Sequence, residues 1–231
     1  MADKATDTTM DSSLLHLLHL VSPTLPTGAF SYSQGLEWAV EKEWINDKAS
    51  LEGWLLDLAR HSMAYVDIPL LKRMHRAIQN SKTEELEKWV DTLLACRETS
   101  ELQEEEQTRG RALATLLGNL GLMEESVPLN ILKRSQLAGY VLAAKQWHIE
   151  VRDAALGYVW AWLENQVITG IKIIPLGQTQ GQQLLMALSS EIPAIVDHGL
   201  QLTDHEIGAA SPALALACSM HESQYTRLYR S

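Results

Sequence analysis

Histidines are the side chains to test first for metal chemistry. His16 and His19 are three residues apart in a segment with helical periodicity, so both imidazoles would lie on one face, as two metal ligands would. No cysteine, aspartate or glutamate at metal-binding spacing accompanies them, and the apolar stripe of the same segment lies on the other side. We therefore expect two exposed polar side chains that point away from the core, and no metal bound directly by this chain.

Covalent and nucleotide chemistry have little support in the sequence. The string GAFSY at 28–32 lacks the second glycine of a nucleophile elbow. The glycines at 177 and 181 are followed by two glutamines instead of the lysine and hydroxyl residue of a phosphate-binding loop. We expect no catalytic residues, and we do not expect this chain to hydrolyse a nucleotide by itself.

Acidic residues gather near the start of a predicted helix, at Glu101, Glu104, Glu105 and Glu106. Charge runs of this kind are usually solvated, and acids near a helix start are favoured by its dipole. We expect a solvated helix face, and a docking patch for a basic partner is the alternative. Cys96 lies among apolar residues on the preceding predicted helix and is expected to be a core thiol.

Two other segments carry side chains suited to binding. Lys172 stands within the short apolar run 171–174, and it would either extend its charged end to water or contribute to a partner surface. The segment 220–231 holds two tyrosines and two arginines without glycine or proline. Tyrosine and arginine are enriched at binding hot spots, so this tail either packs on its own core or binds a partner.

Composition limits the class of protein. The net charge of the 231 residues is −10 with a pI near 5.2, which argues against nucleic acid and anionic membrane as partners. No apolar run approaches the ~20 residues of a membrane helix. Residues 1–11 are polar and are expected to be a disordered lead-in, not a signal peptide. Cys96 and Cys218 form no paired motif, which favours a reducing compartment and a cytoplasmic location.

The elements that must position these residues are helical. Apolar spacing of three and four recurs along the chain, and the β-branched run 171–174 is too short to predict a sheet. Helix starts are predicted from four capping pairs, which are Ser31 with Gln34, Ser81 with Glu84, Ser100 with Gln103, and Thr203 with Glu206. Breaks or kinks are expected at Gly170, Pro175, Pro193 and Pro212. The prediction is an all-α fold, a single globular bundle of about ten helices over residues 12–219, followed by the tail 220–231.

The most distinctive segment is residues 22–37, which we call the motif loop. It is rich in turn-forming residues and carries two aromatic residues between two predicted helices, which indicates a loop built to pack or to be recognised. Its residues resemble the P-x-G-x-(F/Y)-S-x-S-x-G-L-E signature of the urease accessory protein F family. The signature positions are Pro26, Gly28, Phe30, Ser31, Ser33, Gly35 and Glu37, and Pro23, Tyr32 and Gln34 belong to the same candidate loop.

Three later segments resemble the same family in the same order. Residues 93–102, with the acidic run behind them, resemble its central helix, 170–178 resemble its G-x-K-x-x-P-x-G-Q element, and 221–231 resemble its C-terminal tail. The resemblance extends from about Leu14 to the last residue. Two conservative departures, at residues 27–30 and 228–229, bear on partner affinity and not on family membership.

The resemblance implies a non-catalytic helical scaffold for assembly of the nickel centre of urease in the cytoplasm. The implied partners are accessory protein D, called H in some systems, the GTPase accessory protein G, the urease apoprotein and a second copy of the chain. Nickel and GTP would be used by the wider complex, and regulation of the GTPase is implied. Residues implied to face the GTPase are Lys172, Pro175, Gly177 and Gln178, and those implied to bind accessory protein D are Tyr225, Arg227, Leu228, Tyr229 and Arg230.

Two alternatives to this function remain open from the residues alone. One is a helical adaptor with no connection to urease. The other is an all-α enzyme, in which His148 with Asp153, or His61 with Asp67, would supply an acid–base pair in a deep pocket.

Overall fold

The computed structural model describes residues 3–208 and 211–231. Its α-helices are α1 (Asp3–Leu20), α2 (Leu36–Glu41), α3 (Lys48–Leu58), α4 (Asp67–Gln79), α5 (Thr83–Cys96), α6 (Ser100–Asn119), α7 (Leu129–Leu132), α8 (Gln136–Gln146), α9 (Val151–Ile173), α10 (Gln178–Ser189), α11 (Ile192–Gln201) and α12 (Pro212–His221). Shorter turns are η1 (Ala29–Ser31), the π-helical η2 (Ala59–Met63) and η3 (Asp204–Glu206). The described residues contain no strand, so the prediction of a single all-α bundle is confirmed.

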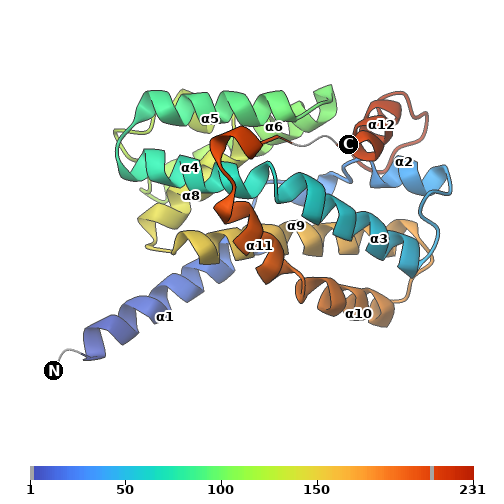
Figure 1. The fold of residues 1–231 in the computed structure, drawn as a ribbon, viewed down its shortest axis with the longest axis horizontal. Coiled ribbons are helices and arrows are strands. Elements are labelled where there is room, and N and C mark those ends of the chain that lie inside the picture. The colour runs from blue at the N-terminus through green and yellow to red at the C-terminus, as the bar shows by residue number, and fades with distance from the viewer. Residues whose placement is uncertain (1–2, 209–210) are drawn as a thin grey trace.

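Two groups of helix contacts organise the bundle (Figure 1). One is centred on α4 and α8, and the other on α9. Helix α4 packs against α5 and α8, and α8 also packs against α6. Helix α9, the longest, contacts α3, α4, α10 and α11, and the ends of α1 and α2. Leucine, isoleucine, valine and alanine side chains from nearly every helix form one continuous core. Burial of that apolar surface is the main favourable contribution to stability.

Several helix starts differ from those predicted. Ser31 ends the turn η1, and α2 begins only at Leu36, after Gly35 in the left-handed region. Ser81 has a φ of 54° and its side chain does not cap α5. Thr99, one residue before the predicted Ser100, caps α6 by accepting from the amide of Leu102 at 3.3 Å. Thr99 and Ser100 both carry a hydroxyl group, and the backbone conformation decides which of them caps the helix. The sequence pattern does not encode that conformation.

The helix breaks predicted at proline and glycine also differ from the observed ones. Helix α9 continues through Gly170 and ends at Ile173, so the connection to α10 is residues 174–177, which include Pro175. Pro193 and Pro212 lie in the first turns of α11 and α12, where a missing amide hydrogen costs no hydrogen bond. The Thr203–Glu206 pair is present, with the Glu206 carboxylate accepting from the Thr203 amide at 2.8 Å, but it caps only η3.

Helix α1 differs from expectation in its extent and in the face it presents. Residues 3–11, expected to be a disordered lead-in, form its first half. His16 and His19 do not point away from the body, because their rings stack on Trp147 with centroids 4.9 and 5.8 Å away. Figure 1 shows α1 projecting from the body toward the N-terminus.

Candidate interaction site

The motif loop divides into an exposed half and a buried half. Pro23, Pro26 and Phe30 in the first half are exposed, and Gly28 reaches a φ of 74° in open space. From Tyr32 to Glu37 the side chains are buried, except for the half-buried Gln34. The loop therefore presents one surface to solvent and fixes the other to the body of the protein.

Gly35 fixes the buried half against α12. Its φ is 75°, and a Cβ atom there would lie 2.9 Å from both the Ala217 Cβ atom and the Cys218 backbone nitrogen. Both the backbone conformation and the close approach require glycine at this position. The loop and the C-terminal helix thus pack with no room between them.

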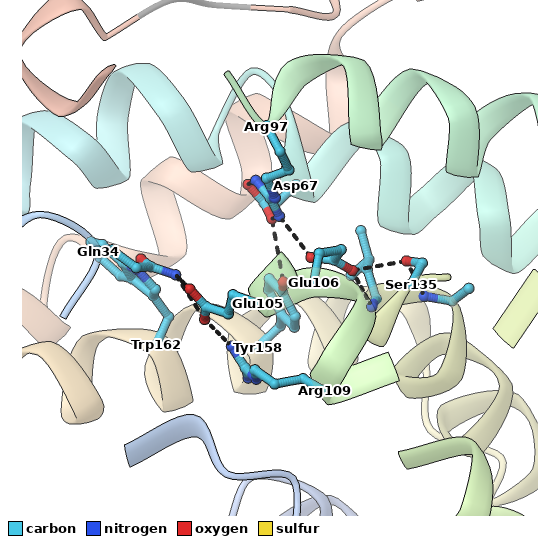
Figure 2. A network of polar contacts seen from close by, with 11 residues as sticks. Gln34, Asp67, Arg97, Glu105, Glu106, Arg109, Ser135, Tyr158 and Trp162 are labelled. Atoms are coloured by element: carbon cyan, nitrogen blue, oxygen red, sulfur yellow. Dashed lines mark hydrogen bonds and ion pairs between the residues drawn. The ribbon is translucent and has the colours of Figure 1, made fainter. Parts of the chain in front are cut away.

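Beneath the loop lies a buried polar network, drawn in Figure 2. The Arg97 guanidinium at the end of α5 donates to the Asp67 carboxylate at 2.6 Å and reaches Glu106 at 3.2 Å. Glu106 in turn accepts from the Ser135 hydroxyl at 2.9 Å and from the Leu137 amide at 3.0 Å. This series of ion pairs and hydrogen bonds therefore connects the starts of α4 and α8 to α6.

A second branch connects the same helix to the motif loop. Arg109 donates to Glu105, one turn earlier on α6, at 2.7 Å. The Gln34 amide nitrogen of the loop donates to both oxygens of Glu105 at 3.2 Å, and its oxygen accepts from the Trp162 indole at 2.8 Å (Figure 2). Gln34 is thus the contact through which the loop reaches the network.

These contacts correct the expectation of a solvated acidic face. Glu104 is exposed, but Glu105 and Glu106 are 4% and 5% exposed. Burial alone would lower the pKa of Arg97, but Asp67 and Glu106 raise it well above its usual range. A buried charge of this kind is tolerated because it is paired and hydrogen-bonded, and removing one partner leaves the other uncompensated.

The Tyr158 hydroxyl completes this part of the network. It donates to Asp67 at 3.3 Å. Burial raises the pKa of Tyr158 well above its ordinary value, and the neighbouring carboxylates of Asp67 and Glu106 raise it further. Tyr158 is therefore a neutral donor at any physiological pH, and not an acid or base.

The network borders a cavity of about 260 Å³ between the motif loop, α6 and α9. Its described lining contains no histidine, and Asp67, Glu105 and Glu106 are all held by arginines. Neither pair named for an all-α enzyme converges here. His61 contacts Asp57 at 2.8 Å instead of Asp67, and His148 and Asp153 are both exposed and lie outside the cavity lining. Apolar side chains also line the cavity, as do Glu98 and Glu164, and burial raises the pKa of Glu164. The carboxylates of the network are therefore engaged in structural ion pairs, and no histidine in the described lining faces them across the cavity.

The C-terminal segment folds onto the buried half of the loop through Glu37, which is 8% exposed. Its carboxylate accepts from the amides of Leu228 and Tyr229 at 2.7 and 3.0 Å, and contacts the His221 ring at 3.3 Å. The main-chain oxygen of Ser231 accepts from the amide and hydroxyl of Ser33. We call this set of contacts the tail clamp. The tail therefore packs on its own chain.

Despite the clamp, part of the tail surface is free in this chain. Tyr225 is fully exposed, and the Leu228 side chain is 75% exposed although its amide is bound. Arg227 is half exposed and pairs with Glu101 at 2.8 Å, whereas Tyr229 is buried. The backbone amide of Arg230 donates to Ser31 at 2.8 Å, and its side chain is exposed at the same surface. The clamp thus holds an apolar and basic surface in one conformation.

The other predicted group lies between α9 and α10. Lys172 is in the last turn of α9, Pro175 and Gly177 form the connection, and Gln178 begins α10. All four are exposed. Within the described residues, no hydrogen bond or ion pair joins this group to the tail. The tail does reach the same helix, because the Tyr229 side chain hydrogen-bonds Thr169, one turn before Lys172.

Within residues 3–208 and 211–231, no three histidine, cysteine, aspartate or glutamate side chains lie together as metal ligands would. None of the helices in the same part of the chain combines the length and the apolar composition needed to span a membrane.

Comparison with known proteins places these features in a family. A protein-family profile described as UreF matches residues 45–189. A protein from Pseudomonas entomophila (strain L48), named urease accessory protein UreF, is 47% identical over 221 residues, which cover 96% of this chain and 99% of the relative. Relatives of the same name from Teredinibacter turnerae and Alcanivorax borkumensis are each 44% identical, over 96% of this chain and 100% and 99% of their own. The chain belongs to the UreF family.

The network of this UreF-family chain includes residues that sequence reasoning missed. Arg97 and Arg109 were not singled out, and Glu106 was assigned to solvent. One signal was available, because Leu102 and Leu113 bracket Glu106 and Arg109 at spacings of three and four. Extending the apolar stripe of α6 toward its start places Glu106 on the buried face.

Proposed function

We propose that this chain is a non-catalytic accessory protein of urease maturation. The observation that carries the proposal is the tail clamp, in which a buried carboxylate holds the tail on the motif loop and leaves Tyr225 and Leu228 in solvent. Large apolar side chains held rigidly at a surface are suited to binding a partner, since little conformational entropy is lost on association. The names of the relatives supply the process in which that partner acts.

The proposed partners are divided between the two exposed surfaces. Accessory protein D, called H in some systems, binds the tail surface at Tyr225, Leu228 and the arginines. The GTPase, accessory protein G, binds at Lys172 and the connection to α10. The chain's net charge of −10 favours basic surfaces on these partners.

The wider complex uses nickel and GTP, which this chain does not bind directly. It acts on the urease apoprotein in the cytoplasm, with two copies of this chain in the complex. Contact at Lys172 would let the chain regulate the GTPase by raising or lowering its GTP turnover.

The test is reconstitution of urease from apoenzyme, nickel, GTP and the accessory proteins, with and without this chain. Urease activity that requires this chain supports the assembly role. A folded chain that binds neither accessory protein D nor G and leaves activation unchanged would overturn the proposal and favour an unrelated helical adaptor.

Matched variants assign the two surfaces. The double change Tyr225→Ala and Leu228→Ala is expected to weaken binding of accessory protein D at least tenfold while GTPase binding is retained. Lys172→Ala is expected to weaken binding of the GTPase while binding of accessory protein D is retained. The controls are Met186→Ala, an exposed apolar residue on α10, and Lys133→Ala, an exposed lysine after α7. Equal loss of both contacts in either test variant would contradict the division.

A further inference from the structure

His221, the last residue of α12, is fully buried, and both of its ring nitrogens face carboxylates. Its Nδ1 atom lies 2.8 Å from Oε2 of Glu101 on α6, and its Nε2 atom lies 3.3 Å from Oε2 of Glu37 on α2. A carboxylate oxygen only accepts, and a neutral imidazole has a single N–H group to donate. Two simultaneous hydrogen bonds therefore require one more proton, either on the ring or on one of the carboxyl groups.

The other partners of the two glutamates place that proton on the ring. The Glu37 carboxylate accepts from two backbone amides of the tail. The second oxygen of Glu101 accepts from the Arg227 guanidinium at 2.8 Å. Amide donors and a guanidinium both favour the ionised form of a carboxylate. The cluster then balances, with two carboxylates against one imidazolium and one guanidinium.

The remaining groups around His221 also favour a cation. Burial raises the pKa of the Cys218 thiol, one turn earlier on α12, and the surrounding carboxylates raise it further. Burial likewise raises the pKa of Tyr229 in the tail, so both groups stay neutral. The charged and titratable groups near the ring, from every element packed against it, are Glu37, Glu98, Glu101, Glu105 with its partner Arg109, Cys218, Glu222, Arg227 and Tyr229.

We propose that His221 is a buried imidazolium that positions the tail surface, so that presentation of this surface depends on pH. With both protons in place, the ring joins α2 to α6 beside the carboxylate that holds the tail amides. When one proton leaves, a ring nitrogen with a lone pair faces a carboxylate oxygen, and that buried carboxylate loses a donor. The tail clamp then weakens, and Tyr225 and Leu228 lose their fixed positions.

The direction of the pH dependence follows from linkage. Because the clamp contains the protonated ring, clamping and proton binding favour each other. The stabilisation is greatest at low pH, where the ring is protonated in both the clamped and the detached tail, and it is lost as the pH rises and the clamped ring gives up its proton. The inference deepens the proposed function, on which it rests only for the identity of the partner that binds the tail surface.

The first measurement is ¹⁵N NMR of the histidine rings in the full-length chain at pH 7.5. Both ring nitrogens of His221 are expected to carry protons. An ordinary histidine is only about one tenth protonated at this pH. His61, which is exposed and pairs with Asp57, is the matched comparison and is expected to be largely neutral. A neutral His221 ring in the folded wild type would overturn the proposal.

The second measurement is hydrogen exchange of the Leu228 and Tyr229 amides from about pH 6 to 10, a range that starts above the titration of ordinary glutamates. Protection is expressed relative to the intrinsic exchange rate at each pH. In the wild type it is expected to fall about tenfold or more as the His221 ring loses its proton, because a buried charged group loses a hydrogen bond. Core amides such as Leu142 should stay protected throughout, which shows that the fold persists.

Two variants separate titration of His221 from a general effect of pH. Glutamine can donate to one carboxylate but does not titrate, so His221→Gln is expected to give low protection of both tail amides that does not change with pH. His61→Gln is expected to follow the wild type. Protection that stays constant in the wild type up to pH 10, or that keeps its pH dependence in His221→Gln, would overturn the proposal.

Binding of accessory protein D by the wild type should weaken in parallel, by about tenfold or more across the same pH range. The measurements on the free chain involve no partner, so their failure would leave the reconstitution of urease as an independent test of the proposed function. A tail whose protection follows His221 but which does not bind accessory protein D at any pH would contradict the proposed partner and not the role of His221.

Discussion

Replacing Glu37 by glutamine tests whether its carboxylate holds the tail. Glu37 accepts from the Leu228 and Tyr229 amides with different oxygens, at 2.7 and 3.0 Å. Glutamine keeps the size of the side chain but retains only one acceptor oxygen, and its NH₂ group cannot accept from an amide. One buried amide therefore loses its partner, at a cost of about 2 kcal/mol for a hydrogen bond to a charged group.

The assay is hydrogen exchange of the two amides in the native protein. Since each 1.4 kcal/mol changes an equilibrium tenfold, a loss of about 2 kcal/mol should accelerate exchange at Leu228 and Tyr229 roughly thirtyfold. The effect should be confined to the tail and the motif loop, because the core helices do not depend on the clamp. Trypsin cleavage after Arg227 should accelerate in parallel.

The matched control is Glu41→Gln. Glu41 lies on the same helix one turn later, is exposed, and pairs with its neighbour Lys42. Its replacement should leave exchange at both tail amides unchanged. Exchange in the Glu37→Gln variant that stays within twofold of the wild type would refute the reasoning and would mean that other contacts hold the tail.

Three further perturbations test the loop and the network. Glu106→Gln should lower the free energy of unfolding in urea by about 3 kcal/mol because Arg97 loses a buried partner, and Glu104→Gln should change it little. Gly35→Ala should lower the thermal midpoint much more than Gly28→Ala, since both have positive φ but only Gly35 has atoms 2.9 Å from the added carbon. The hydrogen bond from Arg73 lowers the pKa of Asp204, so this pair stabilises the fold above about pH 4 and the contribution disappears as the pH falls through the lowered pKa. Asp204→Asn should therefore flatten the acid dependence of the thermal midpoint between about pH 5 and 3.

The fold class followed from the sequence because helical periodicity depends on local spacing. Helices α4 and α5 repeat apolar residues every three or four positions, and that spacing alone defines a buried face. Helix starts were less predictable. A serine at 31, 81 or 100 can cap only if its own backbone is extended, and tertiary contacts decide that conformation.

The interaction site could be located but not described from the sequence. The motif loop and the tail were identified by residue type, yet nothing in the sequence places the Leu228 amide on Glu37, 191 positions away. Glu105 and Glu106 look like solvated charges because their arginine partners are recognised only in three dimensions. The exposure of Leu14, Leu15 and Leu18 on α1 was equally hidden, since periodicity reveals an apolar face but not whether another element covers it.

The distance along the chain between Glu37 and its hydrogen-bond donors has a consequence for biosynthesis. At 5–20 residues per second, the 191 positions that separate Glu37 from Leu228 take about 10 to 40 s to synthesise. During that time the core helices can pack, but the Glu37 carboxylate has no tail to bind and must stay solvated, because burying it unpaired is costly. The motif loop therefore reaches its final conformation only after the last residues of the tail have been made, so a nascent chain cannot present the tail surface to a partner before it is complete.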